Sequence, residues 1–375
     1  MRNKNLIAML GGGQLGLMFT EKAQMMGEEV LVLDPDKDCP AGKIANKFIN
    51  AEFTDSKALE TVINYCEVCT TEFENIPYKT LELLEKNIEV FPNSNSLKIT
   101  QNRILEKEFL KEQGIPTTEY YKINSKQELY TLEKIKNWPY ILKTSTFGYD
   151  GKGQVIVNNF EELKNAYKKL NVTSFVLEKK VNLKKEISQV AACYKEKVIY
   201  LPISENIHVN NILHKSLIPA DINDKINKSV QTITEKICVS LNYTGIICIE
   251  FFIDDKNNVL VNEIAPRTHN SGHYSIEGCN ISQFEHQVRI LKKLPPQDSH
   301  LKYNSVMLNL LGDLWENKSL DLNFGNDKDI YLHLYNKTIA KKGRKMGHFT
   351  VVDKFLSSAN VKADKLYNSL KNEKL

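Results

Sequence analysis

The sequence predicts a multidomain protein that combines α/β and α+β architecture. Three observations carry this prediction. A chain of 375 residues is too long for one hydrophobic core. Its first hundred residues alternate short apolar runs with helical stretches, whereas later residues carry apolar runs paired through polar turns. We therefore expect parallel strands with crossover helices first, and antiparallel hairpins after them.

The first unit has a βαβ pattern. Residues 6–10 form an apolar run, 11–13 are three glycines, and 15–26 follow a helical pattern. A second apolar run at 30–33 ends at Asp34. This order predicts a Rossmann-like domain, which a turn-rich stretch around Pro92 closes near residue 100.

Antiparallel strands are expected in the middle of the chain. Residues 140–143 and 154–157 flank a glycine-bearing loop and predict one hairpin. Residues 246–253 and 259–264 predict a second hairpin through a polar turn. A double proline at 295–296 then breaks the chain, and a small β-rich domain follows. These breaks predict three domains, at residues 1–100, 101–295 and 296–375.

The composition fits a globular enzyme and gives no sign of a membrane or nucleic-acid partner. Fifty lysines and arginines against 46 acidic residues give a net charge of +4, and the lysines are spread along the chain. No apolar run approaches the ~18 residues of a membrane span, and no signal peptide is evident. Seven scattered cysteines, including Cys66 and Cys69, indicate reduced, buried thiols. A cytoplasmic location is expected.

The glycine turn is the first candidate site. Gly11, Gly13 and Gly16 satisfy G-x-G-x-x-G between a strand and a helix, and Asp34 follows at the spacing of a ribose-binding carboxylate. One hypothesis is therefore a dinucleotide-dependent oxidoreductase. Turns of this kind also bind other ligands, so the alternatives stay open.

A polar loop is the second candidate. Lys143 enters it, three glycines lie within it, and Gln154 ends it. Backbone amides and lysines suit a phosphate chain, and such a loop can fold over ATP. An ordinary hairpin with solvated lysines is the alternative.

A carboxylate pair and a polar segment follow each other. Glu250 and Glu263 lie in strands joined by a hairpin, so the two side chains can converge on Mg²⁺. The segment 266–273 then offers Arg267 for an oxyanion, and His269 or His273 for proton exchange. Surface carboxylates and a solvated loop are the alternatives.

The last candidate is a group of cations near the C-terminus. Lys337 and the run 341–345 surround a glycine and could bind a phosphate, or they could form a solvated patch. The lysine-rich residues 363–375 are expected to form a solvated terminal helix.

Taken in order, these elements resemble the ATP-grasp superfamily and, within it, the N5-carboxyaminoimidazole ribonucleotide synthase family, over essentially the whole chain. Residues 148–154 and 262–273 are the most specific stretches. The resemblance implies an ATP-grasp domain between a Rossmann-like pre-ATP-grasp domain and a small C-terminal domain. It also implies a cytoplasmic homodimeric ligase of de novo purine biosynthesis that uses ATP and Mg²⁺. Bicarbonate and 5-aminoimidazole ribonucleotide would be joined through carboxyphosphate.

The resemblance also implies roles for individual residues. For ATP these are Arg103, Lys143, Gly148, Tyr149, Asp150, Gly151, Lys152, Gly153, Gln154, Glu178, Lys179, Lys180, Val181, Glu186, His208, Asn262 and Glu263. For Mg²⁺ they are Glu250 and Glu263. For catalysis they are Arg267, His269, Asn270 and Lys152. For the ribonucleotide they are Gln14, Leu15, Glu72, Tyr149, Lys337, Arg344 and Lys345.

A second ATP-grasp enzyme, the formate-dependent glycinamide ribonucleotide transformylase, is the nearest rival. That family typically has serines where Tyr149 and Asp150 stand, and an aspartate where Asn270 follows His269. These residues favour the carboxylase. Phe147 departs from the glycine common at its position in the family loop.

Overall fold

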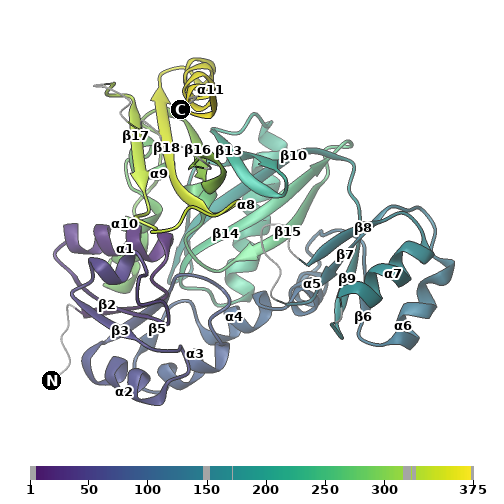
Figure 1. The fold of residues 1–375 in the computed structure, drawn as a ribbon, viewed down its shortest axis with the longest axis horizontal. Coiled ribbons are helices and arrows are strands. Elements are labelled where there is room, and N and C mark those ends of the chain that lie inside the picture. Colours follow the sequence, from purple (N-terminus) through teal and green to yellow (C-terminus); the bar gives the residue numbers. More distant parts are fainter. Residues whose placement is uncertain (1–5, 147–152, 171, 316–321, 323–326, 373–375) are drawn as a thin grey trace.

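The computed structural model describes residues 6–146, 153–170, 172–315, 322 and 327–372. Figure 1 shows an N-terminal domain, a four-stranded unit that projects to one side, and a central sheet between them that the C-terminal strands extend. The expectations for Phe147, Gly148, Tyr149, Asp150, Gly151 and Lys152 lie outside the described residues.

The N-terminal domain is built on a five-stranded parallel sheet in the order β3-β2-β1-β4-β5. This confirms the βαβ prediction. Apolar side chains cover both faces of the sheet, so two separate cores form. The strands are β1 (Leu6–Leu10), β2 (Glu29–Asp34), β3 (Lys47–Asn50), β4 (Val68–Thr71) and β5 (Glu89–Val90); the helices are α1 (Gln14–Met25), α2 (Ser56–Tyr65), α3 (Tyr78–Glu85) and α4 (Ser94–Thr100).

The four-stranded unit is antiparallel, in the order β6-β9-β7-β8. The predicted hairpin of β7 and β8 is confirmed. Helix α7 turns Leu163 and Ala166 towards the sheet and leaves its charged residues in solvent. The elements are β6 (Tyr120–Ile123), α6 (Lys126–Thr131), β7 (Tyr140–Thr144), β8 (Gln154–Val157), α7 (Phe160–Leu170) and β9 (Phe175–Lys179).

The central sheet has nine strands, in the order β15-β14-β10-β12-β13-β16-β18-β17, with β11 paired to β10. Its strands are β10 (Leu183–Tyr194), β11 (Lys197–Tyr200), β12 (Ser204–Val209), β13 (Ile212–Ile218), β14 (Gly245–Asp254), β15 (Val259–Ala265), β16 (Asn304–Leu311), β17 (Ile330–Leu334) and β18 (Lys345–Asp353). The helices are α5 (Arg103–Glu112), α8 (Asp224–Ser240), α9 (Ser275–Gly278), α10 (Gln283–Leu291) and α11 (Leu356–Asn372). Because β13 pairs with β16, the C-terminal strands continue this sheet.

Two helices are fixed to the central sheet by their apolar stripes. In α8, Ile226, Val230 and Ile237 repeat at helical spacing and enter the sheet's main core, while Asn223 caps the first turn. In α11, Ala363 and Leu370 are buried in the core that α11 shares with β16 and β18. The expectation of a solvated terminal helix is therefore wrong, because small and apolar residues recur at helical spacing and form one face that packs on the sheet.

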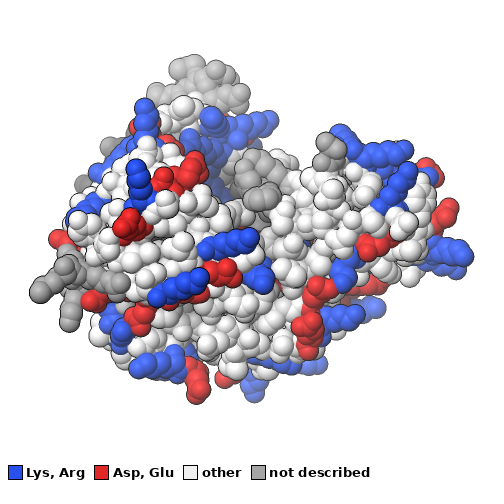
Figure 2. All heavy atoms as spheres, turned by 90° about the horizontal axis from the view of Figure 1, so that it is seen from below, with Lys and Arg blue, Asp and Glu red and all other residues white. Residues whose placement is uncertain are grey.

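Neither the charges on the surface shown in Figure 2 nor Cys66 and Cys69 indicate a functional site. On the face shown in Figure 2, basic and acidic side chains are interspersed. Among the described helices, none is long and apolar enough to cross a membrane. Cys66 and Cys69 are buried free thiols, and burial raises the pKa of both.

Candidate functional site

The glycine turn is occupied by a side chain of the protein itself. Glu72 accepts hydrogen bonds from the backbone N–H of Gly13, at 2.5 Å, and of Leu15, at 3.0 Å. A Cβ at Gly13 would overlap this carboxylate, which explains the glycine. Asp34 accepts the Gly12 N–H at 2.7 Å. A protein carboxylate thus lies where a pyrophosphate would bind, which contradicts the dinucleotide hypothesis.

Beside this turn, residues from opposite ends of the chain meet. Lys337 Nζ donates to Gln14 Oε1 at 3.0 Å and to the Lys345 carbonyl at 2.7 Å. It also lies 5.3 Å from the ring centre of Tyr335. Arg344, next in the chain to Lys345, donates to the Ile339 carbonyl at 3.0 Å. The structure therefore brings Gln14, Lys337 and Lys345 into one cluster at the start of α1.

A buried stack of aromatic rings supports that cluster. The Tyr335 hydroxyl is 2.8 Å from His348 Nδ1, and the His348 ring lies between His333, at 4.6 Å, and His273, at 4.7 Å. Burial lowers the pKa of both His273 and His348 well below the usual range. His273, one of the two candidate proton carriers, is therefore a packed, neutral ring within this stack. Nothing in the local sequence around His273 indicates this stack.

The carboxylate pair converges as predicted. Glu250 in β14 lies directly opposite Glu263 in β15. A bulge sets this register, because Phe251 pairs with Val261 and leaves Asn262 as the extra residue. Burial, and then the negative charge of Glu263, raise the pKa of Glu250 to about 7. Two facing carboxylates in a sheet are unfavourable unless a cation lies between them.

The segment after β15 places a cation and an imidazole beside this pair. Arg267 Nε donates to Glu74, a half-buried carboxylate from the N-terminal domain. Burial alone would raise the pKa of Glu74, but Arg267 outweighs it and the net shift is downward. His269 Nε2 is 3.4 Å from Glu250 Oε1, and its Nδ1 is 2.8 Å from Ser271 Oγ. Burial, then the charges of Arg267 and Lys345, lower the pKa of His269, so this imidazole is neutral.

Asn270 is held by a residue that sequence reasoning missed. Its amide nitrogen donates to Asn309 Oδ1 at 3.1 Å, and Asn309 Nδ2 donates back to Asn270 Oδ1 at 2.5 Å. Asn309 also donates to the Leu213 carbonyl at 2.8 Å. The amide of Asn270 is thus fixed by β16. No motif marks Asn309, which reads as one polar residue inside an apolar strand.

Charged residues also meet where the four-stranded unit joins the central sheet. Lys143 Nζ is 3.0 Å from Glu178 Oε2, and Lys107 Nζ is 3.7 Å from the same oxygen. Burial would raise the pKa of Glu178, but the two lysines outweigh it and lower the pKa to about 2. Lys179, Lys180 and Val181 follow at the connection from β9 to β10. Lys107 was not predicted, since on sequence it reads as one more lysine of an amphipathic helix.

Among the described residues, other members of the predicted ATP set make the following contacts. Arg103 Nη2 is 4.0 Å from Glu263 Oε2, and its Nη1 donates to the Thr144 carbonyl at 3.1 Å. Glu186 Oε2 is 2.7 Å from His208 Nδ1. Burial lowers the pKa of His208, but Glu186 outweighs it and the net shift is upward. Gly153 and Gln154 begin the return strand of the hairpin, where the Gly153 carbonyl accepts the Thr144 N–H at 2.9 Å.

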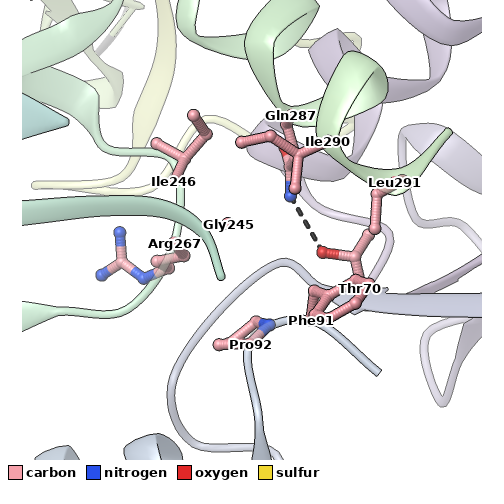
Figure 3. A pocket seen from close by; sticks show the side chains of 9 residues that line it. All are labelled: Thr70, Phe91, Pro92, Gly245, Ile246, Arg267, Gln287, Ile290 and Leu291. Carbon is pink, nitrogen blue, oxygen red and sulfur yellow. Dashed lines mark hydrogen bonds between the residues drawn. The ribbon is translucent and has the colours of Figure 1, made fainter. Parts of the chain in front are cut away.

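A narrow gap behind Arg267 offers no second site. Figure 3 shows the Arg267 guanidinium pointing away from the hydrogen bond of 3.0 Å between Gln287 and Thr70. The gap is too narrow for a water-sized sphere. It is lined by Thr70, Phe91, Pro92, Gly245, Ile246, Arg267, Gln287, Ile290 and Leu291. Arg267 instead pairs with Glu74 and lies within the influence of the Glu263 charge.

Three sequence-family models match consecutive parts of the chain. The ribonucleotide synthetase preATP-grasp domain matches residues 4–101, the ATP-grasp domain matches 108–284, and the phosphoribosylaminoimidazole carboxylase C-terminal domain matches 305–362. An N5-carboxyaminoimidazole ribonucleotide synthase of Staphylococcus aureus strain MRSA252 is 41% identical over 351 residues, which are 92% of each chain.

Solved structures agree with this assignment. The N5-carboxyaminoimidazole synthetase of Staphylococcus aureus, complexed with ADP, has a TM-score of 0.90 and 38% identity, over 99% of this chain and 98% of that one. The N5-carboxyaminoimidazole synthase of Aspergillus clavatus, in complex with ADP and 5-aminoimidazole ribonucleotide, has a TM-score of 0.89 and 28% identity over the whole of both chains. The fold is therefore ATP-grasp, and the chain belongs to the N5-carboxyaminoimidazole ribonucleotide synthase family.

Proposed function

We propose that this chain carboxylates 5-aminoimidazole ribonucleotide with bicarbonate and ATP, in de novo purine biosynthesis. ATP phosphorylates bicarbonate to carboxyphosphate, and the amine of the ribonucleotide then takes the carboxyl group, leaving ADP and phosphate. The observation that carries the proposal is the register of Glu250 and Glu263 beside Arg267 and neutral His269. Family membership supplies the substrates.

Glu250 and Glu263 are proposed to hold Mg²⁺. The two residues fit this ion, since they offer hard oxygen donors and their mutual repulsion disfavours the cation-free pair. When bound, Mg²⁺ offsets the negative charge of the transferring phosphoryl group. Glu250 and Glu263 would place this positive charge within the β14–β15 pair, where Arg103 Nη2 lies 4.0 Å from Glu263 Oε2.

The ATP site is proposed to span the junction of the four-stranded unit and the central sheet. Arg103 and Lys143 face the phosphates, the loop that ends at Gly153 and Gln154 covers them, and the β9–β10 connection contacts adenine. Glu186 and His208 hold each other at 2.7 Å and contact the ribose and its surroundings. The full set is Arg103, Lys143, Gly148 to Gln154, Glu178 to Val181, Glu186, His208, Asn262 and Glu263.

Bicarbonate activation is assigned to Arg267, His269 and Asn270, with Lys152 from the loop. The salt bridge with Glu74 holds Arg267 in place, so its remaining N–H groups can stabilise oxyanion charge without reorganisation. His269 is neutral and can accept a proton near Glu250. A closed site protects carboxyphosphate from water.

The ribonucleotide is proposed to bind across α1 and the β17–β18 connection. Lys337, Arg344 and Lys345 would meet the phosphate, and Glu72 and Gln14 the imidazole. The contact of Lys337 with Gln14 supports this assignment, as does the influence of the Lys345 charge on His269, which indicates that the two sites are neighbours. Leu15 and Tyr149 complete the proposed set.

Phosphate release tests the proposal. The protein is given Mg²⁺ and ATP with 5-aminoimidazole ribonucleotide, and either bicarbonate or formate. We expect release that needs the ribonucleotide and bicarbonate together, with the carboxylated product found by mass spectrometry. Turnover of 5-aminoimidazole ribonucleotide with formate, without a need for bicarbonate, would contradict the assignment.

The finer organisation is also a proposal. We infer a cytoplasmic homodimer with domains at residues 1–100, 101–295 and 296–375, supported by the family resemblance and by the separate sheet of the N-terminal domain. Analytical ultracentrifugation measures the oligomeric state. A monomer across the concentrations used for assays would contradict the dimer.

A further inference from the structure

Lys107 is a buried ammonium group at the junction of the two sheets. It lies on α5, which Figure 1 shows beside the four-stranded unit, and is 1% exposed. Its Nζ donates to Thr117 Oγ1 at 2.6 Å and to Thr118 Oγ1 at 3.1 Å. Lys107 Nζ also donates to the carbonyl oxygen of Asn262 in β15, at a longer distance of 3.4 Å. Burying a lysine costs free energy, and four separate contacts indicate that the fold holds Lys107 in this position.

The fourth contact of Lys107 is with Glu178, which it shares with Lys143. The same Oε2 atom lies 3.7 Å from Lys107 and 3.0 Å from Lys143. Glu178 also accepts from Thr118 Oγ1 at 3.1 Å. The two lysines differ in setting, because the Lys143 side chain is 12% exposed whereas that of Lys107 is 1% exposed. Lys143 is therefore the more accessible of the two lysines.

We propose that Lys107 is a positioning residue that keeps Glu178 paired when Lys143 turns from Glu178 to the phosphates of ATP. This inference rests on the proposed ATP site. If Lys107 were absent, Lys143 would be the remaining ammonium group on a buried carboxylate. Moving Lys143 to the nucleotide would then leave Glu178 without a counter-charge, which opposes nucleotide binding.

Direct nucleotide binding tests the inference. The dissociation constant of a fluorescent ADP analogue, with Mg²⁺, is measured for the wild type and for Lys107→Met, which keeps the length of the side chain. We expect about tenfold weaker binding by Lys107→Met, the size of one hydrogen bond to a charged group. The KM for 5-aminoimidazole ribonucleotide should be unchanged.

A second buried lysine provides the matched control. Lys215 on β13 is 9% exposed and binds Asp364 Oδ1 at 2.6 Å and Asn360 Oδ1 at 3.0 Å on α11. Lys215→Met should lower the melting temperature and leave the dissociation constant unchanged. A drop in affinity for Lys215→Met equal to that for Lys107→Met would overturn the inference, because the effect would then follow from stability alone.

A double variant separates positioning from a general packing role. Glu178→Gln removes the charge that Lys107 is proposed to balance, so adding Lys107→Met to it should change affinity less than twofold. Full additivity of the two changes would contradict the inference, as would wild-type affinity in Lys107→Met. If the wild type itself failed to bind the analogue, the proposed ATP site would be wrong instead.

Discussion

Glu72 and Glu250 are both carboxylates inside the fold, but they are balanced in different ways. Glu72 receives the N–H groups of Gly13 and Leu15 at the start of α1. Glu250 faces another carboxylate, Glu263, and a neutral imidazole. The chain supplies the partners of the first, and we propose that a cation supplies the partner of the second. The Glu72 carboxylate therefore takes the place of a dinucleotide pyrophosphate at the glycine turn, whereas the hairpin of Glu250 and Glu263 is proposed to take a metal ion.

The largest expected effect comes from changing the Glu250–Glu263 pair. Glu263→Gln removes one of the two charges proposed to hold Mg²⁺, so turnover should fall by about 100-fold or more. Phosphate release with all substrates measures the effect, and circular dichroism checks the fold. Glu235→Gln, on the exposed surface of α8, is the control and should keep wild-type rates. Equal rates in both variants would contradict the proposed role of Glu263 in binding Mg²⁺.

Removal of the Glu72 carboxylate should lower the stability of the protein. Glu72→Ala leaves the N–H groups of Gly13 and Leu15 without their acceptor, so the free energy of unfolding should fall by about 3 kcal/mol. Urea denaturation measures this free energy from the unfolding transition of the N-terminal domain. Glu52→Ala, exposed in the same domain, should change stability by less than about 0.5 kcal/mol. A wild-type midpoint in Glu72→Ala would show that water replaces the carboxylate without cost.

The cluster of Gln14, Lys337 and Lys345 beside the glycine turn should give a smaller effect, on substrate affinity. Lys337→Met removes the ammonium that contacts Gln14 Oε1, and the KM for 5-aminoimidazole ribonucleotide should rise about tenfold while that for ATP stays constant. Steady-state kinetics with each substrate varied in turn measures this. Lys341→Met, exposed four residues later, is the control. A rise in the KM for ATP alone would move Lys337 to the nucleotide site.

Local patterns were enough to predict the elements that carry the site. Apolar periodicity and the glycine turn predicted the first βαβ unit, and the polar turn at 254–258 predicted the hairpin that brings Glu250 opposite Glu263. The bulge at Asn262 was not predictable, because it depends on which residues of the two strands pair. Without it, Asn262 would lie opposite Glu250.

Long-range partners could not be predicted from the sequence. Glu74, Lys107 and Asn309 hold Arg267, Glu178 and Asn270, yet each lies at least 39 residues from its partner. The sequence around them has no motif, since their role comes only from the packing of separate sheets. For the same reason, the joining of the C-terminal strands to the central sheet was not foreseen.

The central claim is that Glu250 and Glu263 form a pair that requires a cation. A carboxyl pKa raised by folding costs stability progressively as the pH rises from the ordinary value of 4.5 to the folded value, here about 7, and the full cost is present above it. Removing the charge of Glu250 should therefore stabilise the metal-free protein above that pH and have little effect at pH 5. Cation binding should offset the same cost in the wild type.

The melting temperatures of the wild type and of Glu250→Gln at pH 8, with ADP in the absence and presence of Mg²⁺, test this claim most directly. We predict that Glu250→Gln melts about 2 to 4 °C higher without Mg²⁺. We also predict that Mg²⁺ raises the melting temperature of the wild type alone. Equal melting temperatures without Mg²⁺, together with the same Mg²⁺-dependent rise in both proteins, would contradict the account.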